Sequence, residues 1–84
     1  MWTITYETQP QKFLKKSDKA TKIRILKYLK NVTTNPRVNG KSLSGGLKGL
    51  WRYRVGDYRI ICELRDKELI ILVIEVGHRS IVYK

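Results

Sequence analysis

The first half of the chain changes from a strand-like to a helix-like pattern. Residues 2–6 alternate between apolar and polar side chains, as in a short strand with one buried face. Thr8 to Pro10 then resembles a helix start with proline in the first turn. We expect this first helix to reach about Lys16.

Apolar residues next recur at helical spacing up to about Asn31, which predicts a second helix. Ser17 or Asp18 can cap its first turn, because both side chains accept hydrogen bonds from backbone N–H groups. Lysines and an arginine fill the other flank. The apolar stripe expected to face the core consists of Ala20, Ile23, Leu26 and Leu29.

Pro36 ends the helical pattern. The following residues 37–49 are rich in Gly, Asn and Ser and predict an irregular loop. The stretch GLWRYRVGDYRIICEL, residues 49–64, then places two alternating runs on either side of Gly56 and Asp57, which predicts a hairpin with a two-residue turn.

The last strand is expected from Leu69 to Val76. This run is apolar on both faces, as in a strand with neighbours on both sides, and Gly77 is expected to interrupt it. The whole order, β-α-α-β-β-β, predicts an α+β fold in which two N-terminal helices pack on one face of a small antiparallel sheet.

A two-residue turn determines which hairpin residues lie opposite one another. Counting outward from Gly56-Asp57 pairs Arg54 with Arg59. Because side chains alternate along a strand, one face carries arginines and the other carries the core residues. The predicted core face holds Trp51, Tyr53, Val55, Tyr58, Ile60 and Cys62, and the opposite face holds Arg52, Arg54 and Arg59.

Length and charge narrow the functional classes. The 84 residues suit one small domain, residues 1–84, and the net charge of +11 favours a polyanionic partner such as nucleic acid or the ribosome. No apolar run is long enough to span a membrane, and the start lacks the core of a signal peptide, so we expect a cytoplasmic protein. Cys62 is the only cysteine, no Cys/His set has metal-ligand spacing, and neither a metal nor a cofactor is implied.

The arginine face is a candidate phosphate site. Like charges directly opposite each other destabilise a strand pair by roughly 0.2–1 kcal/mol, whereas a bound phosphate would accept charge-assisted hydrogen bonds from both arginines. A solvated basic face is the structural alternative. Lys41 and Lys48 in the loop before the hairpin are further candidates for contacts with RNA phosphates.

The C-terminal residues GHRSIVYK add groups that can exchange protons. The His78 side chain is suited to general acid or base work near neutral pH. Tyr83 could act in this way only where neighbouring cations lower its pKa, and Arg79 supplies one more fixed cation.

Two stretches, LSGGLKGLWRYRVGDYRIICEL and ILVIEVGHRSIVYK, resemble the RelE/ParE superfamily of toxins from bacterial type II toxin–antitoxin systems, and the RelE-type branch is the nearer one. RelE-type toxins are ribosome-dependent mRNA interferases that cut mRNA in the ribosomal A site, with the 2′-hydroxyl of the preceding nucleotide as nucleophile. The resemblance implies the same endoribonuclease activity here, and the same α+β fold.

The resemblance also implies roles for single residues. Arg59 matches the arginine that steadies the scissile phosphate, Arg79 matches a second phosphate-binding arginine, and Tyr83 matches the C-terminal tyrosine. Arg52 and Arg54 stand where the best-known member has lysines. Because an arginine does not release its proton, we expect these two residues to orient RNA and His78 with Tyr83 to transfer protons.

Two other functions fit the same sequence. A ParE-type toxin would poison DNA gyrase without being a nuclease, and a non-toxic basic module would only bind nucleic acid. Either toxin implies a cognate acidic antitoxin as partner, and the interferase adds the ribosome and mRNA; no membrane or small-molecule cofactor is expected. The mRNA interferase remains the favoured hypothesis because the gyrase poison does not need the cluster His78, Arg79 and Tyr83.

Overall fold

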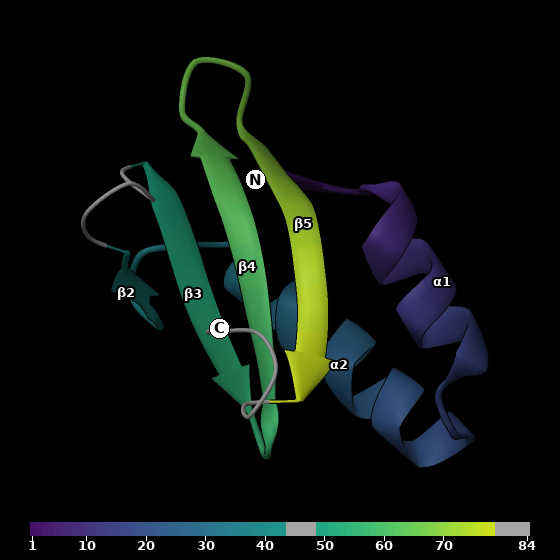
Figure 1. Cartoon of the computed structure of the whole chain (residues 1–84). Helices are drawn as coiled ribbons and strands as arrows, with labels where there is room; N and C mark the ends of the chain where they lie inside the picture. The colour runs from purple at the N-terminus through teal and green to yellow at the C-terminus, as the bar shows by residue number, and fades with distance from the viewer. Residues whose placement is uncertain (44–48, 79–84) are drawn as a thin grey trace.

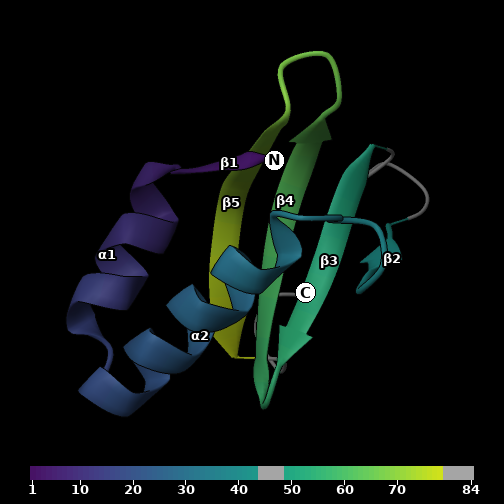
Figure 2. The same ribbon diagram turned by 180° about the vertical axis from the view of Figure 1, so that it is seen from behind.

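The computed structural model describes residues 1–43 and 49–78, and in this part of the chain two helices lie on one side of a five-stranded sheet (Figure 1). Figure 2 shows the helix side, where α2 crosses in front of the central strands and α1 lies beside β1 and β5. The predicted α+β fold is confirmed. Its elements are β1 (Thr3–Tyr6), α1 (Thr8–Lys16), α2 (Lys19–Val32), β2 (Lys41–Ser42), β3 (Leu50–Val55), β4 (Tyr58–Arg65) and β5 (Ile70–His78).

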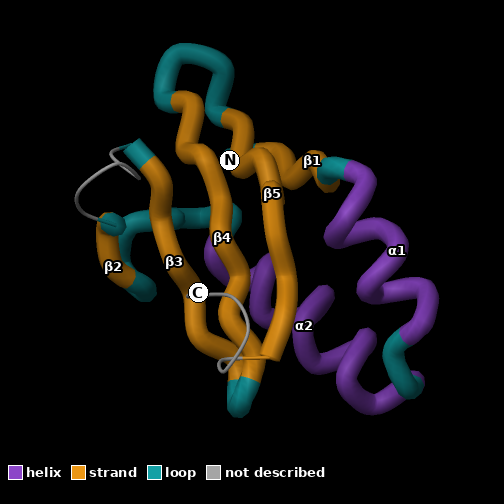
Figure 3. Tube along the Cα trace, viewed as in Figure 1, coloured by secondary structure: helices purple, strands orange, loops and turns teal. Residues whose placement is uncertain are grey.

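The strand order is β1-β5-β4-β3-β2. The pairings within β2 to β5 are antiparallel, but β1 runs parallel to β5, so the sheet is mixed rather than wholly antiparallel (Figure 3). No hairpin joins β1 to β5, and their relative direction is therefore not set by a turn. β5 also continues through Gly77 to His78 instead of ending at the glycine.

Local chemistry explains where the helices begin. Pro10 lies in the first turn of α1, where its missing N–H costs no intrahelical hydrogen bond. Asp18 is the N-cap of α2, and its carboxylate accepts hydrogen bonds from the backbone N and the hydroxyl of Thr21 at 3.2 and 2.6 Å. Of the two predicted caps, Asp18 is therefore the one used.

The buried stripe of α2 differs from the predicted one. Ile25, Leu29 and Val32 face the core, whereas Ile23 is 52% exposed and Ala20 lies on the surface. The stripe at i, i+4 and i+7 is completed by Val32, which lies beyond the end predicted for this helix. Leu29 is buried as predicted and Leu26 packs half-buried against the core, so the buried face overlaps the predicted one and is shifted toward Ile25 and Val32.

The core lies between α2 and the sheet. Ile25 and Leu29 of α2 are fully buried there, together with side chains from the three long strands, which are Tyr53, Ile60, Cys62, Ile71, Val73 and Val76. Burying such apolar surface is the main stabilising contribution to a domain of this size. Among the described residues, no helix is long and apolar enough to cross a membrane.

Candidate nucleic-acid interface

The hairpin has the predicted register throughout. Gly56 has φ of 60° at the first of two turn positions, as a two-residue hairpin turn requires, and Arg54 lies directly opposite Arg59. The predicted core face is confirmed by full burial of Tyr53, Ile60 and Cys62. The alternating side chains therefore bring the arginines to the sheet face that lies opposite the helices.

This arginine face extends over three strands. Lys41 on β2 pairs with Arg52 on β3, which adds a fourth cation to the row. We call Lys41, Arg52, Arg54 and Arg59 the cationic face. Arg54 and Lys41 are exposed, and Arg52 and Arg59 are half-buried. Neighbouring strands lie about 4.8 Å apart, so these side chains can contact the same phosphodiester or two adjacent ones.

An irregularity in β5 adds a carboxylate to this face. The register between β4 and β5 shifts at Ile61/Cys62, so that Ile61 pairs with Glu75 and Cys62 pairs with Val73. Val73 and Val76 are both fully buried although three positions separate them, which shows that the bulge inserts one residue. Strict alternation from Val73 would have turned Glu75 toward the helices; the bulge instead leaves it exposed on the cationic face.

His78 lies on the other side of the sheet. It pairs with Tyr58, and the two rings meet edge to face with centroids 5.9 Å apart. The Tyr58 ring in turn packs edge to face against the Phe13 ring of α1, with centroids 5.7 Å apart. The register thus joins the arginines with one another but places the imidazole on the α1 side, at the end of β5.

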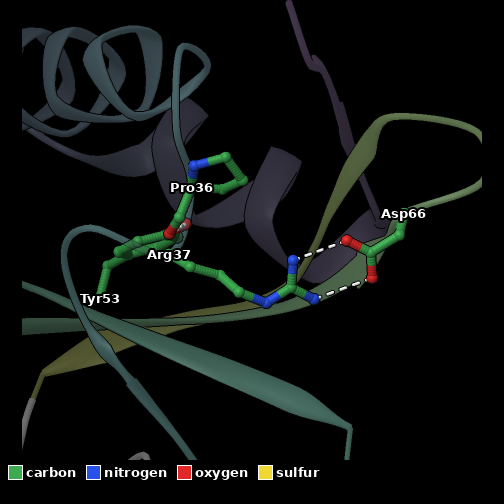
Figure 4. A network of polar contacts seen from close by, with 4 residues as sticks. All are labelled: Pro36, Arg37, Tyr53 and Asp66. Atoms are coloured by element: carbon green, nitrogen blue, oxygen red, sulfur yellow. Dashed lines mark hydrogen bonds and ion pairs between the residues drawn. The ribbon is translucent and has the colours of Figure 1, made fainter.

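The described residues at the start of the predicted loop, up to residue 43, are held by contacts with β3. The buried Tyr53 hydroxyl donates a hydrogen bond to the Pro36 carbonyl at 2.6 Å (Figure 4), and the Trp51 indole donates one to the Asn39 carbonyl at 2.8 Å. Gly40 has φ of 81° and packs directly on β3. These contacts explain why part of the predicted irregular loop forms β2 at the sheet edge.

Arg37 ties the same loop to the turn between β4 and β5. Its guanidinium donates two hydrogen bonds to the Asp66 carboxylate, at 2.6 and 2.9 Å (Figure 4). The same guanidinium lies 6.0 Å from the centre of the Trp51 ring. The hydrogen bonds from Arg37 lower the pKa of Asp66. Sequence reasoning missed this clasp, because residues 29 positions apart carry no local signal of their pairing.

A groove opens on the helix side. It is about 800 Å³ in volume and lies between α1 and the start of β4. Phe13 and Tyr58 form its apolar part, and Lys12 and Lys16 stand on its rim. The groove and the cationic face lie on opposite sides of the sheet.

The predicted site is placed only in part. Arg52, Arg54, Arg59 and Lys41 are brought together, and His78 is separated from them by the sheet. Lys48, Arg79 and Tyr83 lie outside the described residues. Glu63 of β4 also lies on the arginine face, where it forms an ion pair with Arg65. Glu75 was missed; its only sequence signal is a charge that interrupts an apolar strand.

The described residues offer phosphate binding rather than metal or thiol chemistry. They contain no group of three or more His, Cys, Asp or Glu side chains that could hold a metal ion. Burial raises the pKa of the Cys62 thiol to about 12, so this side chain is a core residue and not a nucleophile. Fixed guanidinium groups on a rigid sheet can instead hold a phosphodiester and stabilise added negative charge.

Comparisons with known proteins identify the family and the fold of the chain. Residues 4–83 match a family described as the ParE toxin of type II toxin–antitoxin system, parDE. Among curated proteins, no sequence matches the chain. The fold resembles that in the toxin–antitoxin complex RelBE2 from Mycobacterium tuberculosis, with a TM-score of 0.85, 23% identity, and 93% of this chain and 98% of that chain covered.

Two further solved structures are similar. The isolated RelE toxin of E. coli gives a TM-score of 0.80 at 20% identity, covering 93% of this chain and 84% of that one. The archaeal RelE–RelB complex from Pyrococcus horikoshii gives a TM-score of 0.75 at 24% identity, covering 96% of this chain and 98% of that one. At such identities the likeness establishes a common fold.

Proposed function

Because the chain belongs to the family of ParE toxins of type II toxin–antitoxin systems, we propose that it arrests growth as a ribosome-dependent endoribonuclease that cuts mRNA in the A site. The observation that carries this proposal is the register of the cationic face, which sets Arg54 opposite Arg59 and Lys41 opposite Arg52. Four cations gathered on one patch of a sheet favour a polyanion as ligand.

The proposed reaction is a transesterification within the mRNA. The 2′-hydroxyl of one nucleotide attacks the following phosphodiester, and Arg59 with Arg79 stabilises the charge that develops on the phosphate. Arg52 and Arg54 orient the RNA, with Lys41 and Lys48 on flanking phosphates. His78 and Tyr83 are the sequence-based candidates for proton transfer, but the His78 side chain lies on the α1 side of the sheet, away from the cationic face.

The ribosome and an antitoxin are the proposed partners. α1 and α2 contain no Asp or Glu, and their exposed lysines can contact ribosomal RNA through phosphates. Similar toxins have been solved as toxin–antitoxin complexes. A cognate acidic antitoxin would cover the cationic face and so prevent RNA from binding there. Both proposed targets, mRNA and gyrase, place the protein in the cytoplasm.

One observation favours a second function. The matching family is named for the ParE toxin, and a toxin of the ParE type would poison DNA gyrase without catalysing a reaction. A gyrase poison would need the fold and its basic surface but not a 2′-hydroxyl on its target.

Induction in growing cells separates the two functions. Mapping of mRNA 5′ ends after induction should show new ends in translated regions, spaced in phase with codons, while DNA stays intact. Intact mRNA with gyrase trapped on broken DNA would refute the interferase and support the gyrase poison. Normal growth would refute both.

A further inference from the structure

Glu75 places an acid beside the arginines of the cationic face. A row across the sheet runs from Lys41 through Arg52 and Ile61 to Glu75, one residue from each strand from β2 to β5. In the neighbouring row, Arg59 pairs with Gly77, which leaves a position without a side chain beside the arginine. Glu75 and Arg59 are thus diagonal neighbours, about 7–8 Å apart and within reach of one bound group.

The orientation of Glu75 is held by the backbone on both sides of the bulge. Before it, the Glu7 N–H donates to the Val73 carbonyl at 2.9 Å. After it, the Gln9 side chain donates to the Val76 carbonyl at 2.8 Å and accepts from the Val76 N–H at 2.9 Å. Because Val73 and Val76 are also locked into the core, the bulge has little freedom to turn Glu75 away.

The Glu75 carboxylate has no polar partner among the described residues. It is exposed and forms no hydrogen bond or ion pair with any described residue, unlike Glu63, which pairs with Arg65. A negative charge at this place repels RNA, so it weakens the binding that the surrounding cations provide. A strand that only needed solubility or sheet propensity would be served better by threonine.

We propose that Glu75 is the general base of the cleavage reaction. The backbones of Glu75 on β5 and Arg52 on β3 are two strand spacings apart, about 10 Å. This distance leaves room for a ribose and its phosphate between the carboxylate and the guanidinium groups. An ionised carboxylate accepts hydrogen bonds only, so it is suited to receive the proton of the 2′-hydroxyl. This inference rests on the proposed function, because it assigns a residue to that reaction.

In the proposed step, one bond to phosphorus forms and one bond to phosphorus breaks. The 2′-oxygen forms a bond to phosphorus while its proton passes to Glu75, and the bond from phosphorus to the 5′-oxygen breaks. The 5′-oxygen takes a proton from water, which leaves a 2′,3′-cyclic phosphate and a 5′-hydroxyl. Glu75 then returns its proton to solvent.

The test uses the full chain on ribosomes programmed with a defined mRNA, under single-turnover conditions. Glu75→Gln removes the charge and keeps the shape; Glu63→Gln removes the other acid on the same face and serves as the matched control. Binding is measured separately, with an mRNA that has a 2′-deoxy nucleotide at the cut position. Thermal unfolding of each variant shows that it is folded.

We expect Glu75→Gln to lower the cleavage rate by about 100-fold or more at saturating toxin, in the range of a lost general base. Binding should stay the same or tighten, and formate should restore part of the rate of Glu75→Ala. Glu63→Gln should cleave close to the wild-type rate.

Other results would overturn the inference in distinguishable ways. A wild-type protein that cuts no mRNA refutes both the function and the base. A cutting wild type with an equally fast Glu75→Gln refutes the base alone. A slow Glu75→Gln that also binds weakly, with no rescue by formate, shows that Glu75 supports the structure instead of accepting the proton.

Discussion

Arg54 and Arg59 lie directly opposite each other on β3 and β4, on the face of the sheet away from the helices. Like charges directly opposite each other on neighbouring strands repel, and a phosphate bound between the two guanidinium groups would offset this repulsion.

Replacement of Arg54 should separate the two effects. Arg54→Gln is expected to raise the free energy of unfolding by about 0.2–1 kcal/mol, because one of two opposed charges is removed. The gain should disappear in 1 M NaCl, where roughly 3 Å of screening length remains. In the same variant, the slope of log binding constant against log salt for single-stranded RNA should become shallower by about 0.7. Urea unfolding that shows a loss of stability would contradict this interpretation of the pair.

The hydroxyl of the buried Tyr53 should contribute more to the stability of the protein than the hydroxyl of the neighbouring Tyr28. Tyr53→Phe leaves the Pro36 carbonyl without its partner and is expected to cost about 1–3 kcal/mol. Tyr28 touches the Tyr53 ring but its hydroxyl makes no hydrogen bond with a described residue, so Tyr28→Phe is the matched control. Equal effects of the two substitutions in urea unfolding would show that the loop is not held by this bond.

Gly40 and Gly49 allow backbone strain and steric clash to be compared. Both have positive φ, 81° and 90°, so an alanine is strained at either position, by about 1–2 kcal/mol. At Gly40 an added Cβ would also lie 2.3 Å from the Arg52 carbonyl oxygen, whereas at Gly49 it would meet nothing within 4 Å. Thermal unfolding should therefore show Gly40→Ala as much the more destabilised variant, with β2 detached from β3. Similar losses would contradict the close packing of Gly40.

The Arg37–Asp66 ion pair should make part of the stability depend on pH. Arg37 lowers the pKa of Asp66 in the folded state, so the contribution of the pair is complete above the ordinary pKa of an aspartate, about 3.9. It is lost as pH falls through the lower folded pKa. The difference in melting temperature between wild type and Asp66→Asn should therefore be present at pH 6 and vanish near pH 2. A difference that persists in acid would mean that the substituted amide disturbs packing rather than charge.

The hairpin could be predicted from sequence because its determinants are local. Gly56-Asp57 defines a two-residue turn, and alternation then assigns each side chain to a face. The core face and the arginine face followed from counting. The apolar pattern was a poorer guide for α2. Its apolar residues can be assigned to two overlapping stripes, and the stripe that ends at Val32 is the buried one.

The rest of the site depends on contacts between distant residues. The bulge that turns Glu75 outward is visible only in the pairing of β5 with β4, and Gln9, 67 positions away from Val76, helps to hold it. The position of His78 likewise follows from its pairing with Tyr58. Such relationships are set by tertiary packing and have no signature in a local pattern.

The most direct test of the proposed function is cleavage of mRNA on programmed ribosomes by the purified chain, with free mRNA in parallel. We expect the wild type to cut ribosome-bound mRNA in the A-site codon and to leave free mRNA intact. Arg59→Ala should lower the rate by about 100-fold or more, because a charge-stabilising donor is lost, while Lys67→Ala in the exposed turn between β4 and β5 should change it far less. Uncut ribosomal mRNA, or equal cutting by wild type and Arg59→Ala, would contradict the proposal.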